Sequence, residues 1–563
     1  MLLSGIRFKQ DGRALLFVCR KMKQHNKKAE WFILLSIFVL LSFLCIFTEL
    51  RSKDMFGVDG AFRCLEVYRR KILFFHENNH LLYPANVLIW SRISKTVGRE
   101  PSTPEGFFAM AQLMNCVAGA GCLAILFYLT YRASSSGWLA LGVAASYGFS
   151  RAFLIHSTNS AEALMGVFWS LLALSCASLA VKYASSWPLI GSGLLFSLAM
   201  ATYQTTIFLA PAAIALFWYG RSKAADEAFR WRSRAYDLAI FVWAGLVGCV
   251  LIFGLAYRYE GIHGPVNMLT NFFVHRDARA YLGVGVGKSI NLPVGMVRNV
   301  FPILSNFAGI RTFLSGPKLT VVFSLLLIIS SAALLMICAI RLRKGWTGLQ
   351  PRTQTGVLVA VTGLTFTIVP LIIWDPQYDK LWLQPLACLA FLVGIALGAV
   401  HLPGDKRILL SKVIPGIIFA GLAFNVVEAV RNHLLENNDV KETERLATII
   451  GERDLLIGDW DKVSVLYDYG WSRDGHFLSF PSEAVFFGPD SVSRLRKAVE
   501  KTQASGGRIY FLGILDEPER VWESFLGLRC GVPYSALNTY RAHSSIFAGY
   551  NSRPALRKLE LAD

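Results

Sequence analysis

Apolar residues fall in long blocks along the chain, and polar segments separate the blocks. Each block is roughly 20 residues long, which as a helix crosses about 30 Å of hydrocarbon. The stretch from Trp187 to Tyr219 is too long for one crossing, so we divide it near Ala201–Thr206. The pattern predicts an all-α polytopic membrane bundle of about eleven transmembrane helices. The expected spans are 31–50, 107–130, 137–155, 163–181, 188–203, 205–220, 238–257, 319–340, 355–374, 382–401 and 408–427.

Basic residues indicate the orientation of these helices, because short cytoplasmic loops are enriched in Lys and Arg. If the basic N-terminal tail lies in the cytoplasm, Lys and Arg then occur in every second loop, at Arg132, Lys182, 221–234, 341–344 and 406–407. The first apolar block is too long for a cleavable signal peptide and is typical of a signal anchor. With an odd number of helices, the pattern predicts a cytoplasmic N-terminus and an extracytoplasmic C-terminus.

This orientation divides the chain into a cytoplasmic basic tail (1–30), a membrane domain (31–427) and an outward-facing soluble domain (428–563). Two further outward segments are large, the first at 51–106 and the second at 258–318. In the C-terminal domain, short apolar runs predict strands and the segments around them predict helices, so we expect a small α/β domain. The expected strands are Asp454–Gly458, Val463–Tyr467 and Arg508–Gly513, and the expected helices are Ser491–Gln503 and Glu517–Leu526.

Composition agrees with a membrane protein. The 563 residues are 54% hydrophobic and 17% charged, whereas soluble domains carry about 25% charged residues. The formal net charge of +19 is explained mainly by cytoplasmic anchoring residues. Nucleic-acid binding would need a basic soluble domain with aromatic or groove-reading motifs, and the sequence contains none, so we exclude that class.

Acidic residues gather in the first outward loop, soon after the first predicted helix: Asp54, Asp59 and Glu66. A carboxylate near the membrane surface is suited to act as a general base, which accepts the proton of a hydroxyl group that attacks a lipid-borne substrate. The alternative is that these acids are ordinary solvated charges of a loop.

The same loop contains His76-Glu77-Asn78-Asn79-His80, which matches the zinc-protease pattern H-E-x-x-H. That motif needs a helix to bring both imidazoles to one face, but the two Asn residues are poor helix formers and Pro84 follows shortly. No convincing third ligand follows on a nearby segment, so we expect no zinc site. A divalent cation or a phosphate group bound by His76 and His80 remains open, as does a plain loop role for His76.

The early outward acid, followed by Asn78-Asn79-His80-Leu81-Leu82-Tyr83, resembles the GT-C membrane glycosyltransferases that use polyprenyl-phosphate sugars. The chain is similar to the dolichyl-phosphate-mannose protein mannosyltransferases and their bacterial relatives over residues 30–430. The resemblance implies that Asp59 takes the place of the catalytic acid, with Asp54 as the second choice. The chain departs from the family pattern in having Asp59-Gly60 instead of a paired Asp-Glu, and Gln112 where many relatives have Arg.

The resemblance further implies an inverting transfer in which an anionic polyprenyl phosphate leaves, and such a leaving group needs cations near the membrane surface. Lys380 is a candidate for this role because it lies just before a helix that re-enters the membrane. Snorkelling of the side chain would also explain a basic residue there. Glu162 follows His156-Ser157-Thr158-Asn159 at a predicted outward helix end, where Thr158 or Asn159 could alternatively cap the next helix. The candidate substrate-binding residues are His76, Asn79, His80, Tyr83, Glu162, Arg276, Arg279, Arg298, Tyr378 and Lys380.

We therefore expect an enzyme of a bacterial inner membrane, which transfers sugar from a lipid-linked donor to a glycan, lipid or protein acceptor on the outer face. Membrane lipids are the other expected partners. A multi-pass transporter is an alternative, but transporters place ionisable groups near the bilayer midplane, and the predicted midplanes here are nearly free of charge. A membrane zinc metalloprotease built on His76, Glu77 and His80 is the third alternative.

Overall fold

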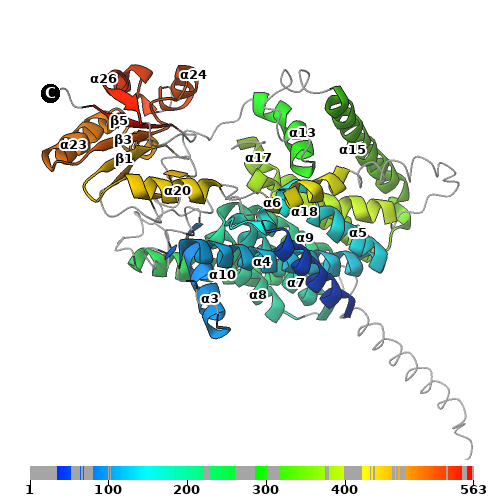
Figure 1. The fold of residues 1–563 in the computed structure, drawn as a ribbon. Helices are drawn as coiled ribbons and strands as arrows, with labels where there is room; N and C mark the ends of the chain where they lie inside the picture. The colour runs from blue at the N-terminus through cyan, green and yellow to red at the C-terminus, as the bar shows by residue number, and fades with distance from the viewer. Residues whose placement is uncertain are drawn as a thin grey trace, which may run out of the picture.

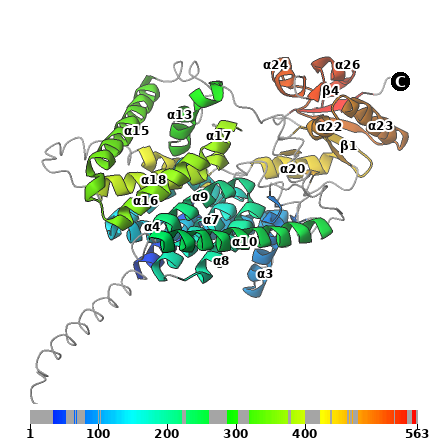
Figure 2. The same ribbon diagram turned by 180° about the vertical axis from the view of Figure 1, so that it is seen from behind.

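The computed structural model describes residues 34–51, 64, 67–68, 80–98, 101, 103–183, 185–220, 227–259, 286–301, 318–373, 379–398, 421–431, 433–434, 438–459, 463–464, 467–468, 476–527, 530–547 and 555–560. A bundle of apolar helices forms one part of the molecule, and a five-stranded sheet with its own helices forms the other (Figure 1). In both views of the ribbon, helix α20 (Asn438–Ile449) lies between the sheet and the bundle (Figure 2).

Within the described residues, six helices are long and apolar enough to cross a membrane, and a bent pair of helices raises this number to seven. The protein is therefore an integral membrane protein with a helical bundle, as the sequence predicts. Two shorter apolar helices, Leu34–Glu49 and Trp187–Thr202, overlap two further expected spans almost completely. The predicted total of eleven is not decided, because residues 399–420, which contain most of the last expected span, lie outside the described residues.

The helices of the bundle follow the apolar blocks closely. They are α3 (Tyr83–Thr96), α4 (Pro104–Ser134), α5 (Gly137–Gly148), α6 (Arg151–Thr158), α7 (Ala163–Tyr183), α8 (Trp187–Thr202), the 3₁₀ segment η2 (Gln204–Leu209), α9 (Ala210–Gly220), α10 (Glu227–Tyr259), α13 (Val286–Val300), α15 (Lys318–Gly345), η4 (Trp346–Gly348), α16 (Pro351–Thr367), α17 (Val369–Ile373) and α18 (Asp379–Gly398). The break after Thr202 lies inside the range at which the sequence divides this stretch.

The expected span over 137–155 is broken, because α5 and α6 meet at an angle of 73°. A break in a membrane helix leaves carbonyl groups that need new donors. Here the Ser150 hydroxyl donates to the Tyr147 carbonyl at 2.7 Å, and the Asn425 amide donates to the Phe149 carbonyl at 2.5 Å. Side-chain donors therefore supplement the backbone hydrogen bonds that remain at the break.

Small residues allow close packing between α8 and α10. A Cβ atom at Gly193 of α8 would lie 2.5 Å from the Phe241 carbonyl oxygen of α10, and one at Gly248 of α10 would overlap the Ser197 side chain. The Ser197 hydroxyl donates to the Gly245 carbonyl at 2.7 Å. Such contacts replace the hydrophobic driving force, which is missing between helices in lipid.

The C-terminal domain contains a mixed sheet with the strand order β2-β1-β3-β5-β4. Its strands are β1 (Leu455–Gly458), β2 (Phe477–Ser479), β3 (Ile509–Leu512), β4 (Ser544–Ile546) and β5 (Leu556–Leu559). Strand β1 runs parallel to β2 and β3, whereas β5 is antiparallel to β3 and β4. The other elements are α22 (Phe480–Phe487), α23 (Asp490–Ala504), α24 (Glu519–Trp522), the π-helical η6 (Glu523–Gly527), η7 (Tyr534–Leu537) and α26 (Asn538–Ala542).

Alternating side chains of the two central strands pack on opposite faces of this sheet, as the period of a β-strand requires. Leu455, Ile457, Ile509 and Phe511 belong to the cluster that includes residues of α22 and α23. Leu456, Tyr510 and Leu512 belong to the cluster that includes α20. Both faces are covered, which explains why these strands are apolar throughout.

The predicted α/β domain is confirmed at this level, and strands β1 and β3 and helix α23 agree with expectation. The expected strand at Val463–Tyr467 is wrong, because the described residues Val463, Ser464 and Tyr467 are helical. Val463 and Tyr467 are four residues apart, so both reach the same apolar cluster from one face of a helical turn. The place beside β1 is taken by β2, which the sequence analysis does not predict.

Candidate functional site

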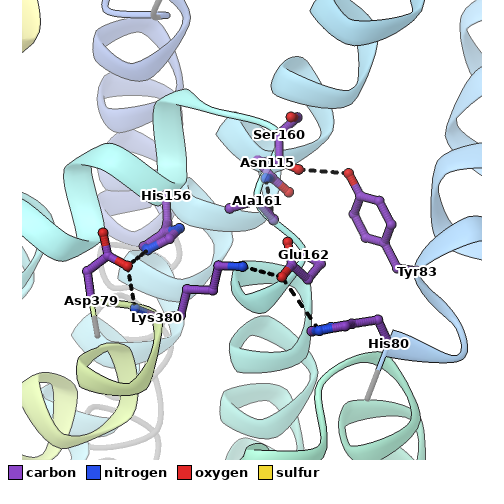
Figure 3. A network of polar contacts seen from close by, with 9 residues as sticks. All are labelled: His80, Tyr83, Asn115, His156, Ser160, Ala161, Glu162, Asp379 and Lys380. Atoms are coloured by element: carbon purple, nitrogen blue, oxygen red, sulfur yellow. Dashed lines mark hydrogen bonds and ion pairs between the residues drawn. The ribbon is translucent and has the colours of Figure 1, made fainter. Parts of the chain in front are cut away.

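A short non-helical segment, Asn159–Glu162, joins α6 to α7 inside the bundle, and all four residues are buried. Its carbonyl groups find donors on two neighbouring helices (Figure 3). The Asn115 amide of α4 donates to the carbonyls of Asn159 at 2.7 Å and Ala161 at 2.6 Å. The Tyr83 hydroxyl of α3 donates to the Ser160 carbonyl at 2.7 Å. Irregular backbone at membrane depth is tolerated only when it is satisfied in this way, so these two side chains hold the segment in place.

Glu162 at the end of this segment is fully buried and lies between two basic side chains (Figure 3). The Lys380 ammonium donates to its Oε1 at 2.5 Å, and His80 Nε2 lies 3.7 Å from the same oxygen. Lys380 and His80 are also buried, with 8% and 7% of their surfaces exposed. The desolvation of such a pair offsets much of its Coulomb energy. Buried ionisable groups in a membrane bundle are therefore a sign of a functional site.

A second acid and base lie beside this pair, at the start of α18. His156 Nε2 of α6 is 3.4 Å from Asp379 Oδ1, and the same oxygen accepts the backbone N–H of Lys380 at 2.8 Å. An acid in the first turn also interacts favourably with the helix dipole. The helix start that carries Lys380 is thereby fixed to α6.

His80 is positioned by the end of α8. Its imidazole stacks on the Tyr203 ring with 5.5 Å between ring centroids. Nearby, the Leu82 N–H donates to the Ala201 carbonyl at 2.9 Å, and the Asn86 amide donates to the Thr202 hydroxyl at 3.3 Å. The end of α8 and Tyr203 therefore fix the segment that carries His80.

The structure brings together four of the predicted site residues: His80, Tyr83, Glu162 and Lys380. Arg298 is half-buried on α13 and lies in the electrostatic surroundings of Arg151. The other predicted site residues, Asp54, Asp59, Glu66, His76, Asn79, Arg276, Arg279 and Tyr378, lie outside the described residues.

The capping alternative for Glu162 concerns the side chains of Thr158 and Asn159. The Thr158 hydroxyl donates to the Leu154 carbonyl within α6, and the Asn159 side chain accepts the N–H of Ser160. Helix α7 begins only at Ala163. Sequence reasoning missed Asn115 and Asp379, although an Asn inside an apolar block and an Asp next to Lys380 are visible signals.

No group of three or more His, Cys, Asp or Glu side chains that could hold a metal ion occurs among the described residues. His80, the last residue of the H-E-x-x-H pattern, lies before α3 and directs its Nε2 atom towards Glu162. Since His76 and Glu77 lie outside the described residues, the zinc alternative itself stays untested.

Comparison with solved structures identifies the fold. ArnT from Cupriavidus metallidurans bound to undecaprenyl phosphate superposes with a TM-score of 0.56 at 12% identity, covering 95% of this chain and 99% of ArnT. Its apo state gives a TM-score of 0.55 at 12% identity, over 94% and 98%. The apo oligosaccharyltransferase of Archaeoglobus fulgidus gives 0.53 at 13% identity, over 90% of this chain and 72% of that one. No protein-family model and no curated protein sequence matches the chain.

The chain therefore has the GT-C fold of the membrane glycosyltransferases, as the resemblance in its first outward loop implies. The match with ArnT extends over nearly the full length of both proteins, and so includes the helical bundle and the C-terminal domain.

Proposed function

We propose that this protein transfers a sugar from a polyprenyl-phosphate donor to an acceptor hydroxyl, with inversion at the anomeric carbon. The observation that carries the proposal is the buried cluster of Lys380, Glu162 and His80 within a GT-C fold. ArnT, which has this fold, is known in a complex with undecaprenyl phosphate. Basic side chains at helix ends are a feature that a lipid phosphate at headgroup depth requires.

In this proposal Lys380 and His80 bind the phosphate of the lipid donor, and Glu162 holds the Lys380 ammonium in position while the site is empty. The phosphodiester of the donor carries one negative charge, as a carboxylate does, and the leaving polyprenyl phosphate gains a second. Its oxygens therefore compete for the Lys380 ammonium most strongly as the sugar is transferred. Arg298 and, in the regions beyond the described residues, Arg276, Arg279 and Tyr378 are further candidates for the same group.

The general base in this proposal is Asp59, or else Asp54. Its carboxylate takes the proton of the acceptor hydroxyl, and the hydroxyl oxygen forms a bond to the anomeric carbon. The bond between that carbon and the phosphate oxygen breaks, and polyprenyl phosphate leaves as the anion. Eleven helices, a cytoplasmic N-terminus and an active site on the outer face of a bacterial inner membrane complete the proposal.

The test uses the full chain in membranes supplied with radiolabelled polyprenyl-phosphate sugar. We expect Asp59→Asn or Asp54→Asn to reduce transfer about 100-fold or more, the usual effect of losing a general base. Glu49→Gln is the matched control, because Glu49 is an exposed acid at the end of the first described helix. If both Asp variants keep full transfer, the assignment of the base is wrong.

Two further measurements separate this proposal from its alternatives. Lys380→Met should raise the KM for the lipid-linked donor more than the KM for the acceptor, because Lys380 is proposed to bind only the donor. A loss of activity with chelators that His76→Ala and Glu77→Ala reproduce would instead favour the metalloprotease reading. An absence of transfer with every lipid-linked sugar, together with solute uptake into vesicles, would favour a transporter.

A further inference from the structure

A pocket of about 570 Å³ opens at the opposite end of α7 from Glu162. Ligand pockets in proteins typically measure about 300–1,000 Å³. The pocket lies among α4, α7, α9, α16 and α18, and much of its wall is apolar, including Leu129, Leu174, Leu216, Val359 and Phe391. The helix ends around it are those that the sequence places on the cytoplasmic side.

Two arginines line this apolar pocket, one of them held firmly in place. Arg132, near the end of α4, donates from Nη1 to the Ser178 carbonyl at 2.8 Å and to the Ser178 hydroxyl at 2.7 Å. Its guanidinium also lies 5.9 Å from the centre of the Tyr128 ring. All of these partners are neutral, so the positive charge is oriented but not neutralised by them.

The second arginine, Arg352, is exposed in the first turn of α16. This turn is joined to the end of α4, because the Thr353 hydroxyl donates to the Ala133 carbonyl at 2.8 Å. The positive end of the α16 dipole therefore faces the same pocket as both guanidinium groups. Anions are favoured at this position by three independent features of the chain.

We propose that this pocket binds an anionic glycerophospholipid of the surrounding bilayer. Its phosphate would lie between Arg132 and Arg352, where guanidinium groups can form bidentate hydrogen bonds, and an acyl chain would fill the apolar part. Basic pockets between transmembrane helices are typical sites for acidic phospholipid headgroups. A soluble anion would leave the apolar wall in contact with water. The proposal is independent of the proposed glycosyl transfer.

The test uses the full-length protein, delipidated in detergent and studied by native mass spectrometry with added phosphatidylglycerol or phosphatidylcholine. We expect a retained phosphatidylglycerol adduct and weaker binding of phosphatidylcholine. Arg352→Gln and Arg132→Gln should each weaken phosphatidylglycerol binding about fivefold, the effect of one basic side chain near a membrane surface. Arg352 is exposed, so its variant is expected to fold normally.

Two controls make the result decisive. Arg343→Gln removes an exposed arginine from the end of α15, outside the pocket, and should leave binding unchanged. Leu216→Trp fills the pocket while keeping both arginines, and should abolish the adduct. If Arg352→Gln and Arg132→Gln bind like Arg343→Gln, the proposal is wrong. It is also wrong if undecaprenyl phosphate displaces phosphatidylglycerol completely, because the pocket would then be a site for the donor lipid.

Discussion

Lys380–Glu162 and Arg508–Asp454 both pair a basic side chain with a carboxylate, and they lie in the two different parts of the molecule. In the bundle, the Glu162 side chain is fully buried and that of Lys380 is only 8% exposed. In the C-terminal domain, the Asp454 side chain is 6% exposed, but that of Arg508 is 52% exposed. The first pair has lost its water on both sides, whereas the second keeps its cation in contact with solvent.

The hydrogen bonds of Asp454 give this carboxylate a structural role. Asp454 accepts the backbone N–H groups of Gly451 and Arg508, each at 2.8 Å, in addition to two bonds from the Arg508 guanidinium. It thereby ties the start of β1 to the start of β3. Such a carboxylate has a structural role that its contacts explain. The bundle pair carries a desolvation cost on both of its partners, and we infer that function rather than stability retains it.

The largest expected effect is that of Lys380→Met, which leaves a buried carboxylate without its ammonium partner. We expect a loss of about 3–5 kcal/mol of stability, measured by thermal unfolding in detergent. Glu162→Gln in the same chain should restore most of this stability without restoring sugar transfer. Lys344→Met, at an exposed site on α15, should change stability by less than about 0.5 kcal/mol. A double variant as unstable as Lys380→Met alone would contradict the comparison.

The next largest effect concerns the segment that carries Glu162. Asn115→Ala removes the donor of two buried carbonyls, and we expect it to lower the free energy of unfolding by about 2–3 kcal/mol. Transfer should also fall, because Glu162 loses its fixed position. Asn86→Ala removes one longer bond from a half-buried residue and should have a much smaller effect on both quantities. Equal effects of the two variants would show that the segment does not need its carbonyl donors.

A smaller effect is expected in the C-terminal domain. Asp454→Asn keeps the shape of the side chain but removes the charge that pairs with Arg508. Because Arg508 is half exposed, we expect a loss of only about 1 kcal/mol. Hydrogen exchange of peptides that cover β1 and β3 should report it as faster local opening. Sugar transfer should stay at the wild-type level. A large loss of transfer would contradict the assignment of a purely structural role to the Arg508–Asp454 pair.

The smallest effect is the pH dependence of the same carboxylate. Burial opposes its ionisation, but the hydrogen bonds from Arg508 and Gly451 outweigh burial and lower the pKa of Asp454. The ionised Asp454 side chain therefore contributes its full stabilisation above the pKa of about 3.9 that it has in the unfolded chain. This contribution is lost as the pH falls through the lower pKa of the folded protein. Hydrogen exchange of β1 and β3, corrected for its intrinsic pH dependence, should be constant from about pH 7 to 5 in the wild type. Below that range, Asp454→Asn should respond less to acid than the wild type.

Much of the fold could be predicted because each membrane helix must be apolar over a fixed length, and that requirement is local in sequence. Strands β1 and β3 could be predicted for the same reason, since both their faces are buried. The bend between α5 and α6 could not, because it depends on Asn425, which is distant in the chain. The helical turn at Val463 and Tyr467 could not be told from a strand, since a short apolar run fits both.

The candidate site, like the fold, could be predicted only where the signal is local in the sequence. Lys380 and Glu162 each stood out as polar residues at predicted helix ends, but nothing in the sequence joins two residues 218 positions apart. Asn115 looked like one polar residue in an apolar block, because its role depends on where the α6–α7 segment passes. Residues can be recognised from local pattern, whereas their partners follow only from tertiary packing.

Helix α7 gives the site a fixed depth. Its 21 residues span about 32 Å at 1.5 Å per residue, which is close to the hydrocarbon thickness of an average bilayer. In a membrane several Å thicker, the Lys380 ammonium would lie below the plane of the lipid phosphates unless the bilayer thinned around the protein. Such thinning costs a fraction of a kcal/mol for each Å of mismatch. For the donor site proposed at Lys380, hydrophobic matching makes bilayer thickness a determinant of access by the lipid phosphate, and we expect transfer to be fastest in lipids whose thickness equals the length of this helix.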